Sequence, residues 1–162
     1  MSALKRLGIF LTALFLVINI ISRPVFAQTG ACFISAARYY RVPYWALIGI
    51  AKVESGYNAY AVNVDGKGYF PGSYRKAYDI IYSNKDKVFD VGIMQVDKLW
   101  FNRLNIPYYK GLDACYDIYL GAYVLARKIA EYGDTWQGIA AYHSADPGQN
   151  LAYSWEIYRA VQ

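Results

Sequence analysis

A run of apolar residues that ends in a glutamate constrains the fold of this chain more than any other feature. From Pro43 to Gly56 the sequence reads Pro-Tyr-Trp-Ala-Leu-Ile-Gly-Ile-Ala-Lys-Val-Glu-Ser-Gly, and Leu47, Ile50 and Glu54 recur at helical spacing. This predicts a helix that starts near Pro43, stops at Gly56 and carries Glu54 on its buried stripe. Burial and the negative end of the helix dipole favour the protonated carboxyl that a general acid needs.

The alternative interpretation is that Glu54 marks the polar end of a fraying helix and points to water. The other two glutamates of the chain, Glu131 and Glu156, lie among polar neighbours on later segments, whereas Glu54 follows an apolar run. Lys52 marks the solvent face of the predicted helix, and Glu54 lies about 200° from it around the axis. Glu54 is therefore the leading candidate for a catalytic residue.

The N-terminus has the pattern of a secretory signal peptide. Two basic residues precede an apolar run at 7–21, and small residues end at Ala27. An uncleaved membrane anchor is the alternative, but the run is shorter than the roughly 20 residues of a spanning helix and contains Asn19. We expect residues 1–27 to be removed and residues 28–162 to form one domain in the periplasm. Contact with the membrane is expected only through the signal peptide.

Charge and composition exclude two classes of binding partner. The whole chain has a net charge of +5, and removal of the signal peptide takes three basic and no acidic residues, which leaves +2. A domain so nearly balanced lacks the basic stripe that nucleic acid binding needs. A metal site would need more ligands than the chain's one histidine, His143, and two cysteines supply. We expect a monomer without metal or other cofactor.

The two cysteines, Cys32 and Cys115, form one even pair in a chain expected to be exported. An oxidising compartment favours a single disulfide between them. Closing a loop of this length stabilises a fold by about 4 kcal/mol if the effect is chain entropy alone.

The remaining periodic segments predict further helices and one mainly α domain. Helices are expected at about 31–40, 75–84, 113–132 and 134–142, followed by one that opens at Asp146-Pro147. On this last helix, Leu151, Trp155 and Tyr158 are expected to face inward.

The region from about 59 to 96 is rich in Gly, Asp and Tyr and predicts a long irregular loop, apart from the short helix within it. Residues 63–68 superficially suggest a calcium loop. Lys67 stands where a ligand oxygen would be expected, so we predict a turn there instead.

Three short strings carry a resemblance to a known family: Glu54-Ser55-Gly56, Gly92-Ile93-Met94-Gln95 and Ala141-Tyr142-His143. Their order and spacing resemble the soluble-type lytic transglycosylases, relatives of goose-type lysozyme. The segment 112–118, with Gly121, is similar to the small specialised members that are encoded with conjugation and protein-secretion machines. The resemblance implies a lysozyme-like fold in which the long loop separates the Glu54 helix from the Gly-x-Met-Gln motif.

The resemblance implies that Glu54 is the single catalytic acid, which protonates the leaving oxygen and then acts as a base. Most retaining glycosidases add a second carboxylate about 5 Å away. In this family the N-acetyl group of the substrate is thought to assist, and the muramyl C6 hydroxyl closes an anhydro ring. No second carboxylate is therefore demanded, although Asp65, Asp79, Asp90 and Asp97 are all near in sequence.

The implied function is a peptidoglycan lytic transglycosylase that cleaves the MurNAc–GlcNAc β-1,4 bond of glycan strands and leaves 1,6-anhydromuramyl ends. Its task would be to open the wall locally for a conjugation, secretion or pilus apparatus, whose components are the other expected partners. Two alternatives stay open: a muramidase that hydrolyses the same bond, and a wall-binding assembly factor of a secretion system.

The resemblance also assigns substrate-binding residues. Gln95 matches the motif glutamine, whose amide can bond sugar groups, and Gly92 would let the backbone approach closely. Ser55 belongs to the first string, and Met94 fits either a sugar-facing wall or the core. Tyr142 matches the family tyrosine whose hydroxyl can hydrogen-bond the catalytic carboxyl, with core packing as the alternative.

Several positions depart from the family pattern. The family usually has asparagine where His143 stands and glycine where Ala145 stands, and Asp117 replaces an asparagine common in the specialised members. His143 either replaces the hydrogen bond of the amide, as a substrate-binding residue, or titrates near neutral pH. The segment 63–89 is longer than in the simplest members, which fits a lid, a partner-docking loop or a passive insertion.

Overall fold

The computed structural model describes residues 25–144 and 146–162. The chain divides between Ala31 and Cys32, within the first described helix, and the unit Cys32–Gln162 holds the rest of that helix and all the other elements discussed below. The predicted signal peptide lies outside the described residues as far as residue 24, and α2 (Val25–Tyr40) starts before the predicted cleavage point. In the described part of the chain, no helix combines the length and the apolar character that crossing a bilayer requires.

Helix α3 (Tyr44–Ser55) confirms the predicted helix and both of its ends. Pro43 is the N-cap, and Gly56 adopts the left-handed conformation, φ 60°, in which its N–H donates to the carbonyl of Lys52 and the Tyr57 N–H donates to that of Ala51. Leu47 and Ile50 are completely buried, as the stripe predicts. The helix therefore delivers its last turn, with Glu54, to the edge of the core.

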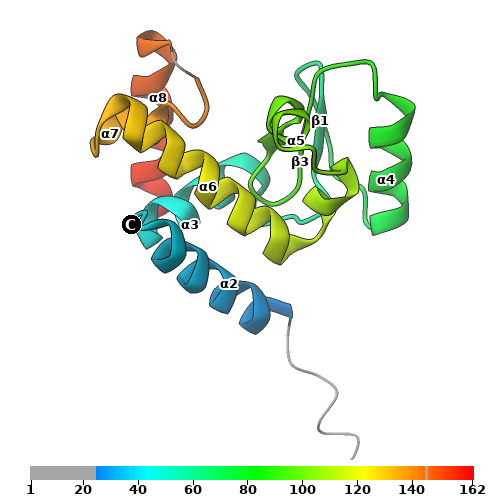
Figure 1. The fold of residues 1–162 in the computed structure, drawn as a ribbon, viewed down its shortest axis with the longest axis horizontal. Coiled ribbons are helices and arrows are strands. Elements are labelled where there is room, and N and C mark those ends of the chain that lie inside the picture. Colours follow the sequence, from blue (N-terminus) through cyan, green and yellow to red (C-terminus); the bar gives the residue numbers. More distant parts are fainter. Residues whose placement is uncertain (1–24, 145) are drawn as a thin grey trace, which may run out of the picture. The chain divides into compact units, whose positions relative to one another are not determined.

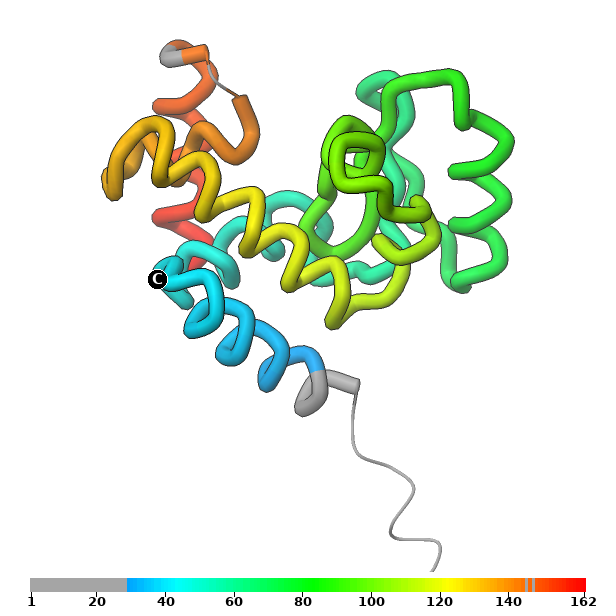
Figure 2. The backbone as a smooth tube through the Cα atoms, in the orientation of Figure 1, coloured from blue at the N-terminus to red at the C-terminus, as the bar shows by residue number. Residues whose placement is uncertain are grey.

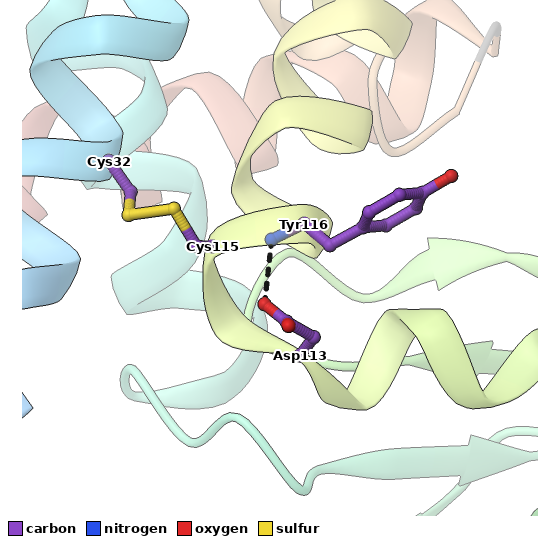
Figure 3. Close-up of a disulfide and its surroundings, with 4 residues drawn as sticks. All are labelled: Cys32, Asp113, Cys115 and Tyr116. Carbon is purple, nitrogen blue, oxygen red and sulfur yellow. Dashed lines mark hydrogen bonds between the residues drawn. A yellow bond between two sulfur atoms is a disulfide. The ribbon is translucent and has the colours of Figure 1, made fainter.

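Helix α6 (Ala114–Tyr132) starts at Asp113, whose side chain accepts a hydrogen bond of 3.0 Å from the Tyr116 N–H. Figure 3 shows this cap beside the disulfide that the two cysteines predict. Cys32, on α2, is bonded to Cys115, in the first turn of α6, with the two Cα atoms 5.5 Å apart. The bond fixes α2 to the start of the helix that crosses the core.

A small antiparallel sheet lies in the region predicted to be an irregular loop. Its strands, in the order β2-β1-β3-β4 across the sheet, are β1 (Val62–Val64), β2 (Lys67–Tyr69), β3 (Phe89–Val91) and β4 (Val96–Asp97). Helix α4 (Tyr74–Ser83) fills the connection between β2 and β3. The predicted turn is the β1–β2 hairpin, where Asp65 and Gly66 both have positive φ, as a primed hairpin turn requires.

The two faces of the sheet differ in polarity. On β3, Phe89 and Val91 are completely buried in the core, while Asp90 between them points to the opposite face. Asn63 on β1 and Asp97 on β4 are the register partners of Asp90. The pleat therefore places Asn63, Asp90 and Asp97 in one polar row across three strands.

The other elements connect the sheet to the C-terminal helices. They are α5 (Lys98–Leu104), the 3-10 helix η1 (Tyr108–Leu112), α7 (Trp136–Ala140) and α8 (Pro147–Ala160). Figure 1 shows α6 extending from the side of the sheet to α7 and α8. The trace in Figure 2 then returns along α8 toward α3, where the Lys52 ammonium donates a hydrogen bond of 3.0 Å to the carbonyl of Ala160.

The inner face predicted for α8 was wrong. Leu151, Trp155 and Tyr158 are 66%, 55% and 42% exposed, whereas Asn150, Tyr153 and Ile157 are buried. Both faces of this helix carry aromatic or aliphatic residues at helical spacing, so the pattern alone favoured the larger side chains. The exposed residues form, with Trp45 and Trp136, an aromatic surface over α3, α7 and α8.

Candidate active site

A cleft of about 430 Å³ lies between the end of α3, the polar row of the sheet, α6 and the segment after α7. Its polar and aromatic lining consists of Glu54, Asn63, Asp90, Gln95, Asp97, Trp100, Lys128, Tyr142, His143 and Ser144. Residues far apart in sequence thus meet around Glu54.

The Glu54 side chain is 15% exposed and is held from one side by two aromatic residues. The hydroxyl of Tyr153, on the buried face of α8, donates a hydrogen bond of 2.5 Å to Glu54 Oε1. His143 Nδ1 lies 3.8 Å from the same oxygen, and the imidazole stacks on the Tyr153 ring with centroids 4.7 Å apart. The carboxyl therefore has a fixed orientation and one face toward the cleft.

Proton affinities in this group follow from its contacts. Burial, and then the nearby Glu54 carboxyl, hold the pKa of Tyr153 well above its usual value, so its hydroxyl remains a donor. The Glu54 carboxyl, 3.8 Å from Nδ1, raises the pKa of His143, against the opposing effect of partial burial. Glu54 thus lies beside the neutral hydroxyl of Tyr153 and beside His143, whose imidazole favours the protonated, charged state.

A second carboxyl of the cleft, that of Asp90, has an unusually high pKa. Burial, followed by the carboxylates of Asp97 and Glu54, raises the pKa of Asp90 to about 7, while His143 opposes the shift. Asp97, its cross-strand neighbour, accepts a hydrogen bond from the Leu99 N–H and caps α5. Asp90 is therefore a titrating acid in the middle of the polar row.

The loop between β3 and β4 is fixed by internal hydrogen bonds. Gln95, at φ 46°, donates from Nε2 to the carbonyls of Gly92 and Ala61, at 2.8 and 3.0 Å. Met94 N–H donates to Asp117 Oδ2 at 2.7 Å, and the Met94 carbonyl accepts from the Tyr142 hydroxyl at 2.8 Å. Because both amide hydrogens of Gln95 are used, its side-chain carbonyl is the group left for a ligand.

Comparison with known proteins decides the family. The family model described as Transglycosylase SLT domain matches residues 31–152. The chain belongs to this family. Among its relatives, an X polypeptide of Escherichia coli is 31% identical over 142 residues, which cover 82% of this chain and 73% of the relative. Protein IpgF of Shigella sonnei is 28% identical over 136 residues, 79% of this chain and 77% of the relative.

A second X polypeptide, from Escherichia coli strain K12, is 28% identical over 138 residues, with 79% of this chain and 70% of the relative covered. Membership of the SLT family and the predominantly helical structure confirm the predicted fold class, a mainly α, lysozyme-like domain. The region between the Glu54 helix and the Gly-x-Met-Gln motif is built from β1, β2, α4 and β3.

The SLT chain brings four of the predicted site residues into one cleft: Glu54, Gln95, Tyr142 and His143. The Tyr142 hydroxyl, however, bonds the Met94 carbonyl instead of the carboxyl of Glu54. The residue that bonds Glu54 is Tyr153, which the sequence analysis missed. A signal was available, because Asn150, Tyr153 and Ile157 share one helical stripe, and polar groups on such a stripe are as anomalous as Glu54 itself.

Three other predicted substrate contacts lie outside the cleft lining. Ser55 is buried, and its hydroxyl donates to the carbonyl of Ile93 at 2.7 Å, which joins α3 to the loop. Met94 is completely buried against Gly121, so its side chain belongs to the core. At Gly92, φ 87°, an added Cβ would lie 2.2 Å from the Gly111 carbonyl. Internal packing is thus sufficient to require glycine there.

Asp117 is the residue that the resemblance sets at an asparagine position of the specialised members. It is completely buried, and burial holds the pKa of its carboxyl well above the usual value, while hydrogen bonds from the loop oppose the shift. In the described residues Oδ1 has no hydrogen-bond partner, and Oδ2 accepts from Met94. A protonated carboxyl has nearly the shape of an amide and carries no charge, which makes this position tolerable without a cation.

Proposed function

We propose that this SLT protein is a peptidoglycan lytic transglycosylase that cleaves the MurNAc–GlcNAc β-1,4 bond. The observation that carries the proposal is the carboxyl of Glu54, 15% exposed, oriented by Tyr153 and open to a polar cleft. In its protonated form Glu54 donates to the glycosidic oxygen. As a carboxylate it then accepts the proton of the muramyl C6 hydroxyl, which closes the 1,6-anhydro ring.

The cleft supplies the polar groups that a sugar needs. The side-chain carbonyl of Gln95 accepts from sugar hydroxyls, because Nε2 is used by the loop. Tyr142 holds the loop and lines the same wall. Trp100, on α5, offers an aromatic face to the sugar ring.

Asp90 supports a second candidate function, hydrolysis by a muramidase. Its carboxyl lines the cleft and is coupled to Glu54, and its pKa of about 7 lets it give or take a proton near neutral pH. A second carboxylate can activate the water that a hydrolase requires. The two functions differ in whether water enters the product.

Digestion of purified sacculi in H₂¹⁸O separates the two functions. Mass spectrometry of the soluble muropeptides is expected to show 1,6-anhydromuramyl ends without ¹⁸O. Reducing ends that carry ¹⁸O would establish the muramidase instead. Glu54→Gln is expected to lose at least about a hundredfold in rate. Glu131→Gln, the same change at an exposed position, is the matched control.

The proposed biological role is local opening of the wall, in the periplasm, for a conjugation, secretion or pilus apparatus. Its support is the similarity of segment 112–118 to the specialised members, together with the three motifs. Complementation of a transfer or secretion defect with Glu54→Gln tests it. Failure to restore transfer supports an enzymatic role, and full restoration indicates the assembly-factor alternative.

A further inference from the structure

His143 is the one histidine of the chain, and it lies in the cleft. It follows α7, where its N–H donates to the carbonyl of Ala140 at 3.1 Å. The imidazole plane is within 16° of the Tyr153 ring on which it stacks, while the His143 side chain is 48% exposed. The ring is thus fixed by one aromatic neighbour and remains in contact with water.

Tyr153 and His143 both place a polar atom near the same atom, Oε1 of Glu54. The hydroxyl of Tyr153 donates to it at 2.5 Å, and Nδ1 of His143 lies 3.8 Å away. The other oxygen, Oε2, is therefore the atom left to exchange a proton with substrate. A charge beside Oε1 can act on the carboxylate without lying in the path of that proton.

The charges that face His143 favour the imidazolium. Glu54 on α3, Glu156 on α8 and Asp90 on β3 all raise its pKa, and Glu54 has the largest effect. Lys128, on α6, is the cation that lines the same cleft. Acidic groups on three elements thus favour the charged form of one imidazole, and Glu54 is the one in direct reach.

We infer that His143 is a positioning residue whose imidazolium stabilises the Glu54 carboxylate between the two proton transfers of the cleavage. This inference rests on the proposed transglycosylase function. The proton first leaves Oε2 for the glycosidic oxygen as the bond between muramyl C1 and that oxygen breaks. The carboxylate then takes the C6 hydroxyl proton as O6 bonds to C1. His143 keeps its own proton throughout, so the steps balance without another reactant.

The inference predicts a specific dependence on pH. When His143 loses its proton, the carboxylate stage loses its neighbouring positive charge, and the rate falls as pH rises through this titration. Because the ion pair is partly exposed, we expect a fall in kcat of about two- to fivefold. KM should change little, since the charge acts on Glu54 and not on the bound sugar. A histidine that only replaced the hydrogen bond of an asparagine would change KM instead.

The ion pair can be tested without any assay of activity. With one histidine in the chain, the imidazole C2 proton gives a single NMR titration curve. Its midpoint is expected to fall in Glu54→Gln, and to fall less in the matched control Glu156→Gln. Equal midpoints in the wild-type protein and Glu54→Gln would overturn the inference.

The kinetic test uses soluble glycan strands and His143→Asn and His143→Gln. Both variants are expected to lose the step in kcat that coincides with the NMR midpoint of the wild-type protein, and to keep their KM. A wild-type pH profile in either variant, or a raised KM with unchanged kcat, contradicts the positioning role. Products without anhydromuramyl ends would instead refute the proposed function, while the NMR comparison would still report on the ion pair.

Discussion

The hydroxyl of Tyr153 donates a hydrogen bond to Oε1 of Glu54 across 99 residues of sequence, and this bond joins α8 to the end of α3. Tyr153 is only 4% exposed, so the bond is shielded from competing water. The orientation of the candidate acid thus depends on a helix whose outer face has no part in the cleft.

Tyr153→Phe removes this donor and keeps the ring. Hydrogen bonds to charged acceptors contribute about 1.5–3 kcal/mol, so we expect the lytic rate to fall about ten- to a hundredfold. Initial rates of turbidity loss from sacculi measure the effect. Tyr158→Phe, at an exposed position of the same helix, is the control. Similar rates in the two variants would contradict an orienting role for Tyr153.

Gly92→Ala is expected to destabilise the fold. The new Cβ would lie 2.2 Å from the Gly111 carbonyl and 2.5 Å from Asp117 Oδ2, at a φ of 87° that other residues rarely adopt. We expect a loss of about 3 kcal/mol in the free energy of unfolding, measured in urea. Gly72→Ala, which meets no atom within 4 Å, is the control and should unfold like the wild-type protein.

Asp90 predicts a pH dependence of stability. Its pKa is about 7 in the folded protein, against about 3.9 for an unperturbed aspartate, so the folded state binds the extra proton between these values. The stability that Asp90 contributes is present below about pH 4 and is lost as pH rises to about 7. Asp90→Asn lacks this loss. The Tm of the variant relative to wild type should therefore increase over that range, and a constant difference contradicts the assignment.

Removal of the disulfide should lower the free energy of unfolding of the domain and leave the structure of the cleft intact. Cys32 and Cys115 are separated by 83 positions, and closing a loop of that size is worth about 4–5 kcal/mol in chain entropy. The double variant Cys32→Ser, Cys115→Ser is expected to lose that amount in denaturant titrations. Reduced wild-type protein should match it. A variant as stable as the oxidised protein would show that the bond adds no stability.

The sequence pattern predicted those elements whose formation depends on residues close together in the chain. The apolar stripe and Gly56 were enough to place α3 and Glu54, because a helix and its stop depend on neighbours in sequence. The strands escaped prediction because two or three residues are too few to show an alternation. Phe89 and Val91 do alternate with Asp90, but the polar row of the sheet forms only because β3 pairs with β1 and β4.

The sequence predicted the site residue that is unusual within its own segment. It did not predict contacts that form only when two distant segments pack together. Glu54 was anomalous within its own helix. Tyr153 contacts Glu54 only because α8 packs on α3. Which of the two apolar faces of α8 is buried depends on this tertiary packing and not on the local sequence. His143 was visible as a departure from a motif, but its stacking on Tyr153 was not.

The aromatic surface over α3, α7 and α8 determines what the protein's fluorescence can report. Trp45, Trp136 and Trp155 are 40%, 42% and 55% exposed, whereas the fourth indole, Trp100, is half-buried. Trp100 alone among the four lines the cleft. Emission of the wild-type protein should therefore respond to aqueous quenchers more than to a bound glycan. A variant that retains only Trp100 would convert the same signal into a direct optical readout of cleft occupancy.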